Sequence, residues 1–160
     1  MDVLLNRTCG NCTACCKTHA VSEINKPAGK WCPHCDIWKG CRIYPDRPMG
    51  CKTFKCEWLK GFGKESHRPD HTKIVLDFFT GGMLPKLLQI WKVGNGKIVE
   101  SFIKKIALFG LAYGISVAII HLSGEKELAL SFDAEISDEM KLALSREKIS
   151  LISPSELSVE

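Results

Sequence analysis

The stretch WCPHC, at residues 31–35, decides how the first half of this chain can fold. A Cys-x-x-Cys pair after a tryptophan is typical of thiol–disulfide oxidoreductases, in which the pair follows a strand and opens a helix. The same spacing is also half of a tetrahedral thiolate metal site. Here the preceding residues, NKPAGK, favour a turn, and another cysteine, Cys41, follows six residues after Cys35. Since this leaves too little chain for the required strand and helix, the sequence predicts a metal-binding turn.

The cysteines around this stretch are numerous and clustered. All nine fall within 48 residues, and the 104 residues that follow hold none. The N-terminus, MDVLLNRTCG, has too short an apolar run for a secretory signal, so we expect a cytoplasmic, reducing location. There, clustered cysteines indicate metal binding or catalysis rather than a disulfide framework. The candidate metal ligands are Cys9, Cys12, Cys15, Cys16, Cys32, Cys35, Cys41, Cys51 and Cys56.

The first cluster is CGNCTACC, residues 9–16. Cys9, Cys12 and Cys15 recur at a spacing of three, which lets one loop direct three thiolates to one centre, as in ferredoxin-type iron–sulfur sites. Cys16 cannot easily face the same way as its neighbour, so we expect it in a second or a shared centre.

The end of the second cluster predicts a helix that starts at Pro48 and continues through MGCKTFKCEWLKG. On that helix Cys51, Phe54 and Trp58 share a face, and Cys56 lies about 140° around the axis from Cys51. The two thiols then serve different centres.

The identity of the metal stays open between zinc and iron–sulfur. Eight thiolates fit two tetrahedral zinc sites, two four-iron clusters, or one of each. The run at residues 9–15 favours an iron–sulfur cluster, the separated pair at 32–35 favours zinc, and His34 could replace a thiolate as a zinc ligand. We take iron–sulfur as the preferred interpretation.

The spacing C-x₂-C-x₂-C-C, followed by a C…C-x-I-Y-x-x-R-P-x-x-C-x₄-C block, resembles the YkgJ-like family of cysteine-cluster proteins, known as zinc- or iron-chelating domains. The matching residues are Cys9, Cys12, Cys15, Cys16, Cys32, Cys41, Ile43, Tyr44, Arg47, Pro48, Cys51 and Cys56. The resemblance implies a thiolate metal site of eight cysteines without Cys35, although it leaves open whether Cys32 or Cys35 is the ligand. It implies no particular activity. From the same motif we expect Tyr44 and Arg47 to donate hydrogen bonds to thiolates or to carbonyls of the ligand loops. Arg47 could equally be a surface residue paired with Asp46.

The second half has the pattern of an α+β fold. Strands are predicted at HTKIVLDFF (71–79), KLLQIWKV (86–93), ISVAIIHL (115–122) and ELALSF (127–132), with a long helix at 98–114 and a short one near 137–145. One helical stripe is predicted to face the sheet: Val99, Phe102, Ile103, Ile106, Phe109 and Tyr113. Gly114 suits the left-handed residue just past the long helix.

The predicted fold class is therefore α+β. A cysteine-rich, metal-stabilised N-terminal half with a short helix precedes a small, mostly antiparallel sheet covered by one long helix. We assign residues 1–62 to the cysteine-rich metal-binding region, 63–152 to the α+β core region and 153–160 to a loose tail, all in one compact unit.

Charge and hydropathy bear on the partners. The apolar stretch at residues 106–120 is shorter than the roughly 20 residues that span a bilayer and contains two glycines, so no membrane segment is expected. Residues 1–75 carry 13 Lys and Arg against 7 Asp and Glu, which is a feature of nucleic-acid-binding domains. Two divalent tetrathiolate sites would themselves bring this excess from +6 to +2. We therefore expect the basic residues to offset thiolate charge, and nucleic acid is not an expected partner.

Function follows from the cysteines alone, because no G-x-S-x-G, P-loop, GxGxxG or HExxH motif is present. We expect a metal-binding protein that holds one or two cysteine-thiolate centres and has a redox or iron–sulfur-related role. The alternative is a structural zinc module that mediates protein or RNA interaction. An enzyme with an open metal position is a third hypothesis, for which the sequence defines no catalytic residue.

Overall fold

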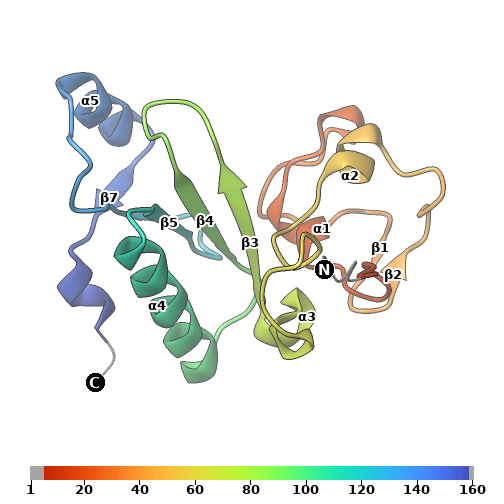
Figure 1. Cartoon of the computed structure of the whole chain (residues 1–160). Coiled ribbons are helices and arrows are strands. Elements are labelled where there is room, and N and C mark those ends of the chain that lie inside the picture. Colours follow the sequence, from red (N-terminus) through yellow and green to blue (C-terminus); the bar gives the residue numbers. More distant parts are fainter. Residues whose placement is uncertain (1–5, 159–160) are drawn as a thin grey trace.

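The computed structural model describes residues 6–158, and its elements fall into a cysteine-rich half and a sheet half (Figure 1). The cysteine-rich half has only short elements: α1 (Ala14–Thr18), η1 (Ser22–Ile24), β1 (Cys35–Asp36), β2 (Gly40–Cys41), α2 (Met49–Thr53) and η2 (Glu65–His67). The sheet half contains α3 (Pro69–Thr72), β3 (Ile74–Phe79), β4 (Leu87–Lys92), α4 (Lys97–Ala112), β5 (Ser116–Ile120), β6 (Lys126–Ala129), α5 (Asp138–Arg146), β7 (Ile149–Leu151) and η3 (Pro154–Leu157).

The main sheet has five strands in the order β3-β4-β5-β6-β7. β3 pairs with β4 and β5 with β6 in antiparallel fashion, whereas β4–β5 and β6–β7 are parallel. The fold class α+β is confirmed, but the prediction of a mostly antiparallel sheet is wrong, because the sheet is mixed. The reason is that α4 and α5 each return the chain to the same end of the sheet, so each forms a parallel crossover.

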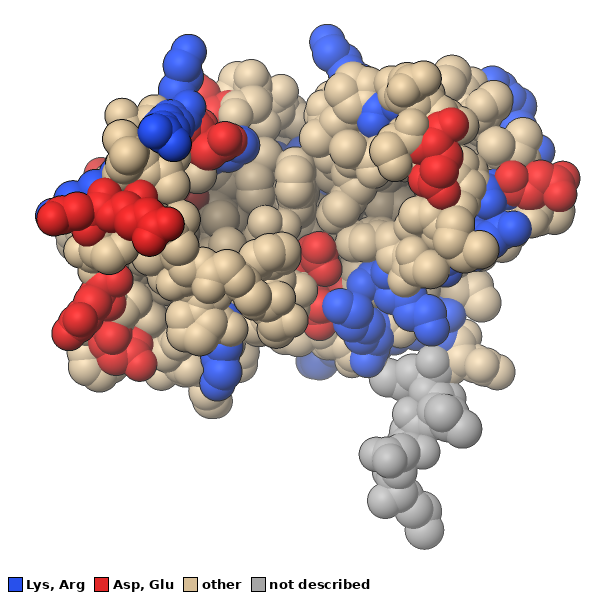
Figure 2. Space-filling view, turned by 90° about the horizontal axis from the view of Figure 1, so that it is seen from above, with Lys and Arg blue, Asp and Glu red and all other residues tan. Residues whose placement is uncertain are grey.

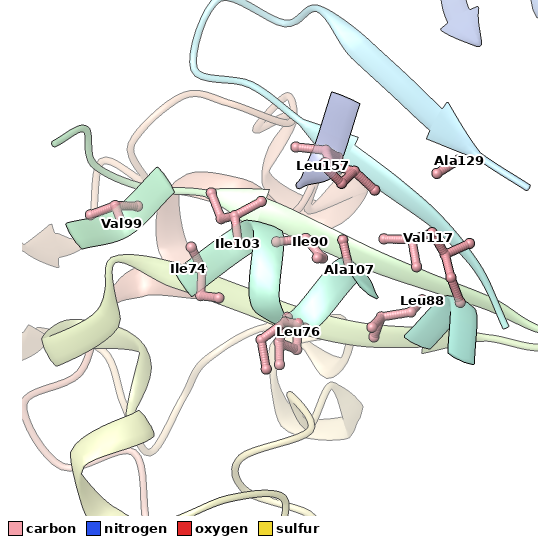
Figure 3. Close-up of a cluster of buried hydrophobic side chains, with 13 residues drawn as sticks. Ile74, Leu76, Leu88, Ile90, Val99, Ile103, Ala107, Val117, Ala129 and Leu157 are labelled. Carbon is pink, nitrogen blue, oxygen red and sulfur yellow. The ribbon is translucent and has the colours of Figure 1, made fainter. Parts of the chain in front are cut away.

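The long helix α4 covers one face of this sheet and buries the main apolar core (Figure 3). Val99, Ile103 and Ala107 on the helix meet alternate residues of the strands, such as Ile74 and Ile90. The predicted stripe is correct for the first turns of the helix. It is wrong at its end, where Phe109 and Tyr113 are exposed and contact each other at 4.7 Å between ring centroids.

Two glycines fit the end of α4 to the sheet. A side chain at Gly110 would place its Cβ only 3.0 Å from Cγ2 of Val117 on β5, so any other residue there would require Val117 or the helix to shift. Gly114 has a φ of 69°, as predicted for the left-handed residue after the helix.

The opposite face of the sheet is shared between α5 and the cysteine-rich half. Met140 and Leu144 of α5 pack on Leu128 of β6. Val75 of β3 lies between the residues that face α4 and points to the other side, where it packs against Trp58 of the cysteine-rich half. The sheet therefore joins the two halves, with alternate side chains of one strand facing each of them.

The C-terminal segment differs from its prediction as a loose tail. Residues Pro154–Leu157 form a 3₁₀ helix, Ser153 and Glu156 form a capping box, and Leu157 is buried in the core below α4. The short length and polar composition of this segment predicted a loose tail, but one buried apolar side chain is enough to anchor it. Residues 159 and 160 of the predicted tail lie outside the described part.

The predicted helix at Pro48 is present but ends at Thr53, so Cys56 and Trp58 do not lie on it. The Thr53 hydroxyl donates to the carbonyl of Met49 at 3.1 Å, a bond that competes with helical backbone pairing. The chain then becomes extended, and the Glu57 N–H donates to the Leu76 carbonyl at 2.9 Å, which covers the outer edge of β3. The angular argument that separated Cys51 from Cys56 therefore does not apply.

The surface shows the charge asymmetry of the two halves. Acidic side chains are prominent at the α5 end of the molecule, with basic ones beside them, and both kinds are interspersed over the cysteine-rich half (Figure 2). None of the helices within residues 6–158 has the length and apolar character needed to cross a bilayer.

Candidate metal centre

The cysteine-rich half encloses a cavity of about 200 Å³ beside β3. The thiol-bearing residues around it come from three separate segments of chain. They are Cys9, Cys12, Cys15, Cys16, Cys32, Cys41, Cys51 and Cys56, and Cys35 is the one cysteine that does not line it. These eight are the cysteines that the resemblance in the sequence implies.

The first segment reaches the cavity through a tight turn into α1. Gly10 adopts a φ of 51°, and the Cys12 N–H donates to the Cys9 carbonyl at 2.8 Å. α1 begins two residues later at the fully buried Ala14 and carries Cys15 and Cys16 in its first turn. This geometry explains how four cysteines in eight residues can face one space.

The stretch 32–41 forms a short hairpin beside the first segment. The Cys35 N–H donates to the Cys32 carbonyl at 3.1 Å, and Cys35 stands opposite Cys41 in the β1–β2 pair. The Cys32 N–H donates to the Cys16 carbonyl at 3.0 Å, which fixes the hairpin to α1. Cys32 faces the cavity, whereas the Cys35 thiol contacts Thr13 and the Cys16 thiol.

Backbone groups lie close to two of the sulfurs. Against the larger effect of burial, the backbone of Ala14 and Asp70 acts to lower the pKa of Cys12, and the backbone of Leu59 and Trp58 acts to lower the pKa of Cys56. Nearby N–H groups favour the charged thiolate over the thiol. Both sulfurs are therefore arranged to hold negative charge.

Burial acts against that charge in a protein without bound cation. It raises the pKa of Cys12 and of Cys35 to about 11. Burial also raises the pKa of three further cavity thiols: Cys9, Cys51 and Cys56. The pKa of Cys16 is raised first by its contact with the Cys15 thiol and then by burial. A metal cation would remove this penalty, because it favours the deprotonated sulfur.

Tyr44 and Arg47 lie at one side of the cavity, next to Cys9. The Tyr44 side chain lies beside the Cys9 thiol. The Arg47 guanidinium stacks on the Tyr44 ring at 3.8 Å, donates to the Tyr44 carbonyl at 3.4 Å and exerts a favourable charge on Cys9. Both act to lower the pKa of Cys9, although burial outweighs them.

Sequence reasoning missed His19. Its ring lines the cavity and lies 4.0 Å from Phe54 and 5.1 Å from Trp91 between centroids, with Nε2 3.7 Å from Oδ2 of Asp77. Burial lowers its pKa, and Asp77 acts in the opposite direction. No signal in the sequence marks this residue, because its partners come from β3, β4 and the segment after α2. His34, which the sequence offered as a zinc ligand, is not among the cavity residues.

The second missed residue is Lys26, which is buried beside α1 with only 4% of its surface exposed. It follows an asparagine and precedes a proline, a context that predicts an exposed turn.

Eight thiols share the cavity, yet their positions do not form a closed coordination group. Within residues 6–158, no three Cys, His, Asp or Glu side chains converge tightly enough to hold a single ion as they stand. No protein-family model, curated protein or solved structure matches the chain. The resemblance to the YkgJ-like family therefore rests on the motif residues of the sequence alone.

Proposed function

We propose that this protein holds one or two metal centres ligated by the cavity thiolates, with an iron–sulfur cluster as the preferred occupant and a redox or iron–sulfur-related role. The observation that carries the proposal is the convergence of eight of nine cysteines on one cavity. Reduced cysteines used only as small apolar residues would have no reason to collect around a shared space. The cysteine spacing that resembles the YkgJ-like family supports the same proposal.

The size and lining of the cavity favour a cluster over a single ion. One water-sized probe occupies about 10–15 Å³, whereas the cavity measures about 200 Å³. A lone zinc ion with four thiolates at about 2.3 Å would leave most of that space empty. Between the sulfurs the wall is largely apolar, with Val21, Ile24, Phe54 and Val75, and an apolar shell is one of the features that set a cluster's potential.

A structural zinc site is the second candidate, and the hairpin at 32–41 favours it. A Cys-x-x-Cys turn whose second cysteine pairs with Cys41 across two short strands is a compact arrangement that suits tetrahedral zinc. In that case the metal orders the cysteine-rich half, and the function lies in the protein or RNA surface that this half presents.

Metal analysis separates these candidates. The protein is purified without oxygen, and iron, zinc and acid-labile sulfide are measured per chain, together with the visible spectrum before and after dithionite. We expect iron with matching sulfide and an absorption that bleaches on reduction. Zinc without sulfide in a colourless protein would replace the cluster with the zinc module. A protein with neither metal would contradict the proposal.

A further inference from the structure

A buried ammonium group lies behind the cavity wall. Lys26 is held by the Val21–Lys26 bridge, in which the two backbone N–H···O bonds measure 2.8 and 3.0 Å. Its Nζ donates to the Lys17 carbonyl at 3.1 Å and to the His19 carbonyl, both at the C-terminal end of α1. A charge this deeply buried is costly unless an opposite charge lies nearby.

Carboxylates do not supply that opposite charge. Across the described chain, no Asp or Glu oxygen lies within 4.0 Å of Lys26 Nζ. Lys26 lies directly behind the cavity wall, because its bridge partner Val21 and its acceptor residue His19 both line the cavity. Burial lowers the pKa of Lys26, and thiols from three segments act in the opposite direction when they are deprotonated: Cys16, Cys32, Cys15 and Cys51.

We propose that Lys26 is the buried counter-charge of the metal–thiolate centre on its side of the cavity. This inference rests on the proposed function. Four thiolates with a divalent ion, or with the oxidised core of a four-iron cluster, carry a net charge of −2. Because Lys26 is itself buried, water screens its charge less than it would at the surface, and this fixed positive charge offsets part of the negative charge of the centre. Lys26 thus favours the loaded centre, whichever metal it holds.

In a cluster, the same charge sets the reduction potential. One electron from an external reductant adds one negative charge to the cluster, and no bond forms or breaks. Since a neighbouring ammonium group stabilises the added charge, Lys26 raises the potential and makes the cluster easier to reduce.

A purely structural role is the alternative, because Lys26 also satisfies two carbonyls at the end of α1. Two substitutions distinguish the roles. Lys26→Arg keeps the charge and the donors, whereas Lys26→Gln keeps a donor and removes the charge. Lys30→Gln removes an exposed charge from the same loop and serves as the control.

The test compares these three variants with the wild type in the full-length, metal-loaded protein. Metal and sulfide content are measured first, and the midpoint potential is then titrated with dithionite and mediators by visible absorbance. For Lys26→Gln we expect the ratio of reduced to oxidised cluster at a given applied potential to fall at least tenfold. For a one-electron couple, this corresponds to a midpoint potential lower by about 59 mV. Lys26→Arg and Lys30→Gln should stay close to the wild type. If the metal is zinc, competition with a chromophoric chelator should show at least tenfold weaker binding in Lys26→Gln alone.

Each outcome decides the question. A wild-type protein without metal overturns the proposed function and the counter-charge together. A loaded wild type whose potential or zinc affinity is unchanged in Lys26→Gln overturns the counter-charge alone. Failure of Lys26→Gln to take up metal, with normal loading of Lys26→Arg, supports the charge. Equal failure of both variants shows that the lysine's shape is required, and it overturns the electrostatic role.

Discussion

The sheet half, residues 69–158, buries thirteen side chains in one apolar cluster, whereas the cysteine-rich half, residues 6–68, has no helix longer than five residues and no strand longer than two. The sheet half is stabilised by ordinary core packing between α4 and the sheet. The cysteine-rich half cannot be stabilised in this way, since its buried apolar side chains are few and most lie against β3 and β4. The difference teaches that the two parts of one small chain need different sources of order, and for the cysteine-rich half we propose thiolate ligation.

The two regions nevertheless share one contact surface. Trp58 packs on Val75 and Val93, and the backbone of Glu57 bonds to the edge of β3. One wall of the cysteine cavity is therefore formed by the sheet, at Val75. We expect the sheet to survive without the cysteine-rich half, and the reverse not to hold.

Removal of the metal should have the largest effect, and it should act on the cysteine-rich half only. Structural zinc contributes about 10–16 kcal/mol to small metal-dependent domains. A chelator under reducing conditions should therefore unfold residues 9–58 and leave β3 to β6 folded. Hydrogen exchange followed by mass spectrometry would show loss of protection in the first segment only. Uniform protection before and after chelation would mean that metal does not order this half.

Substitution of one cavity thiol should have the next largest effect. Cys12 lines the cavity between Cys9 and α1, so Cys12→Ser should lower the metal content and cost about 5 kcal/mol, at the upper end for single substitutions. Cys35→Ser is the matched control, because Cys35 does not line the cavity. Metal content and thermal unfolding of both variants check this pair. Full metal in Cys12→Ser, or equal losses in both, would contradict the ligand assignment.

Shortening a buried side chain in the apolar core should destabilise the sheet half. Ile90 is fully buried under α4, so Ile90→Ala should lower the free energy of unfolding by about 3 kcal/mol through the cavity that it leaves. Ile98→Ala, on an α4 residue that is 87% exposed, should change it by less than about 0.5 kcal/mol. Denaturant titration measures both values, and metal content at low temperature should be unchanged. Loss of metal in Ile90→Ala would show that the halves are not separable.

The smallest predicted effect concerns the contact between the halves. Burial lowers the pKa of His19 from its ordinary 6.5, so the unfolded chain takes up a proton that the folded protein resists. As the pH falls below about 6.5, protonation of this residue therefore lowers the free energy of unfolding, by at most about 1.4 kcal/mol per pH unit. His19→Gln should have a shallower loss of stability between pH 6.5 and 5 than the wild type. If the stability of His19→Gln and of the wild type depended on pH in the same way, burial of His19 in this contact would not account for the loss of stability at low pH.

The sequence predicted the sheet half well, because its pattern is local. Alternation marked β3 to β6, and the spacing of Val99, Ile103 and Ile106 marked the buried face of α4. Strand directions could not be predicted from alternation, since parallel and antiparallel pairs bury the same residues. β7 was missed because three residues give no pattern.

The candidate site was predicted in composition but not in geometry. Cysteine spacing named the residues that line the cavity, and the motif named Tyr44. Lys26 and His19 were missed because their surroundings are assembled from segments far apart in the chain. The helix at Pro48 was predicted too long, because hydrogen bonding of Glu57 to β3 takes precedence over helix propensity.

X-ray absorption at the iron and zinc K-edges of the anaerobically purified protein tests the central claim most directly. It reports which atoms bind the metal and at what distance, without dependence on activity. We predict that every protein ligand is sulfur, with distances near 2.3 Å if the metal is zinc. A metal bound mainly by nitrogen or oxygen, or the absence of any stoichiometric metal, would contradict the assignment of the cavity thiols as a metal centre.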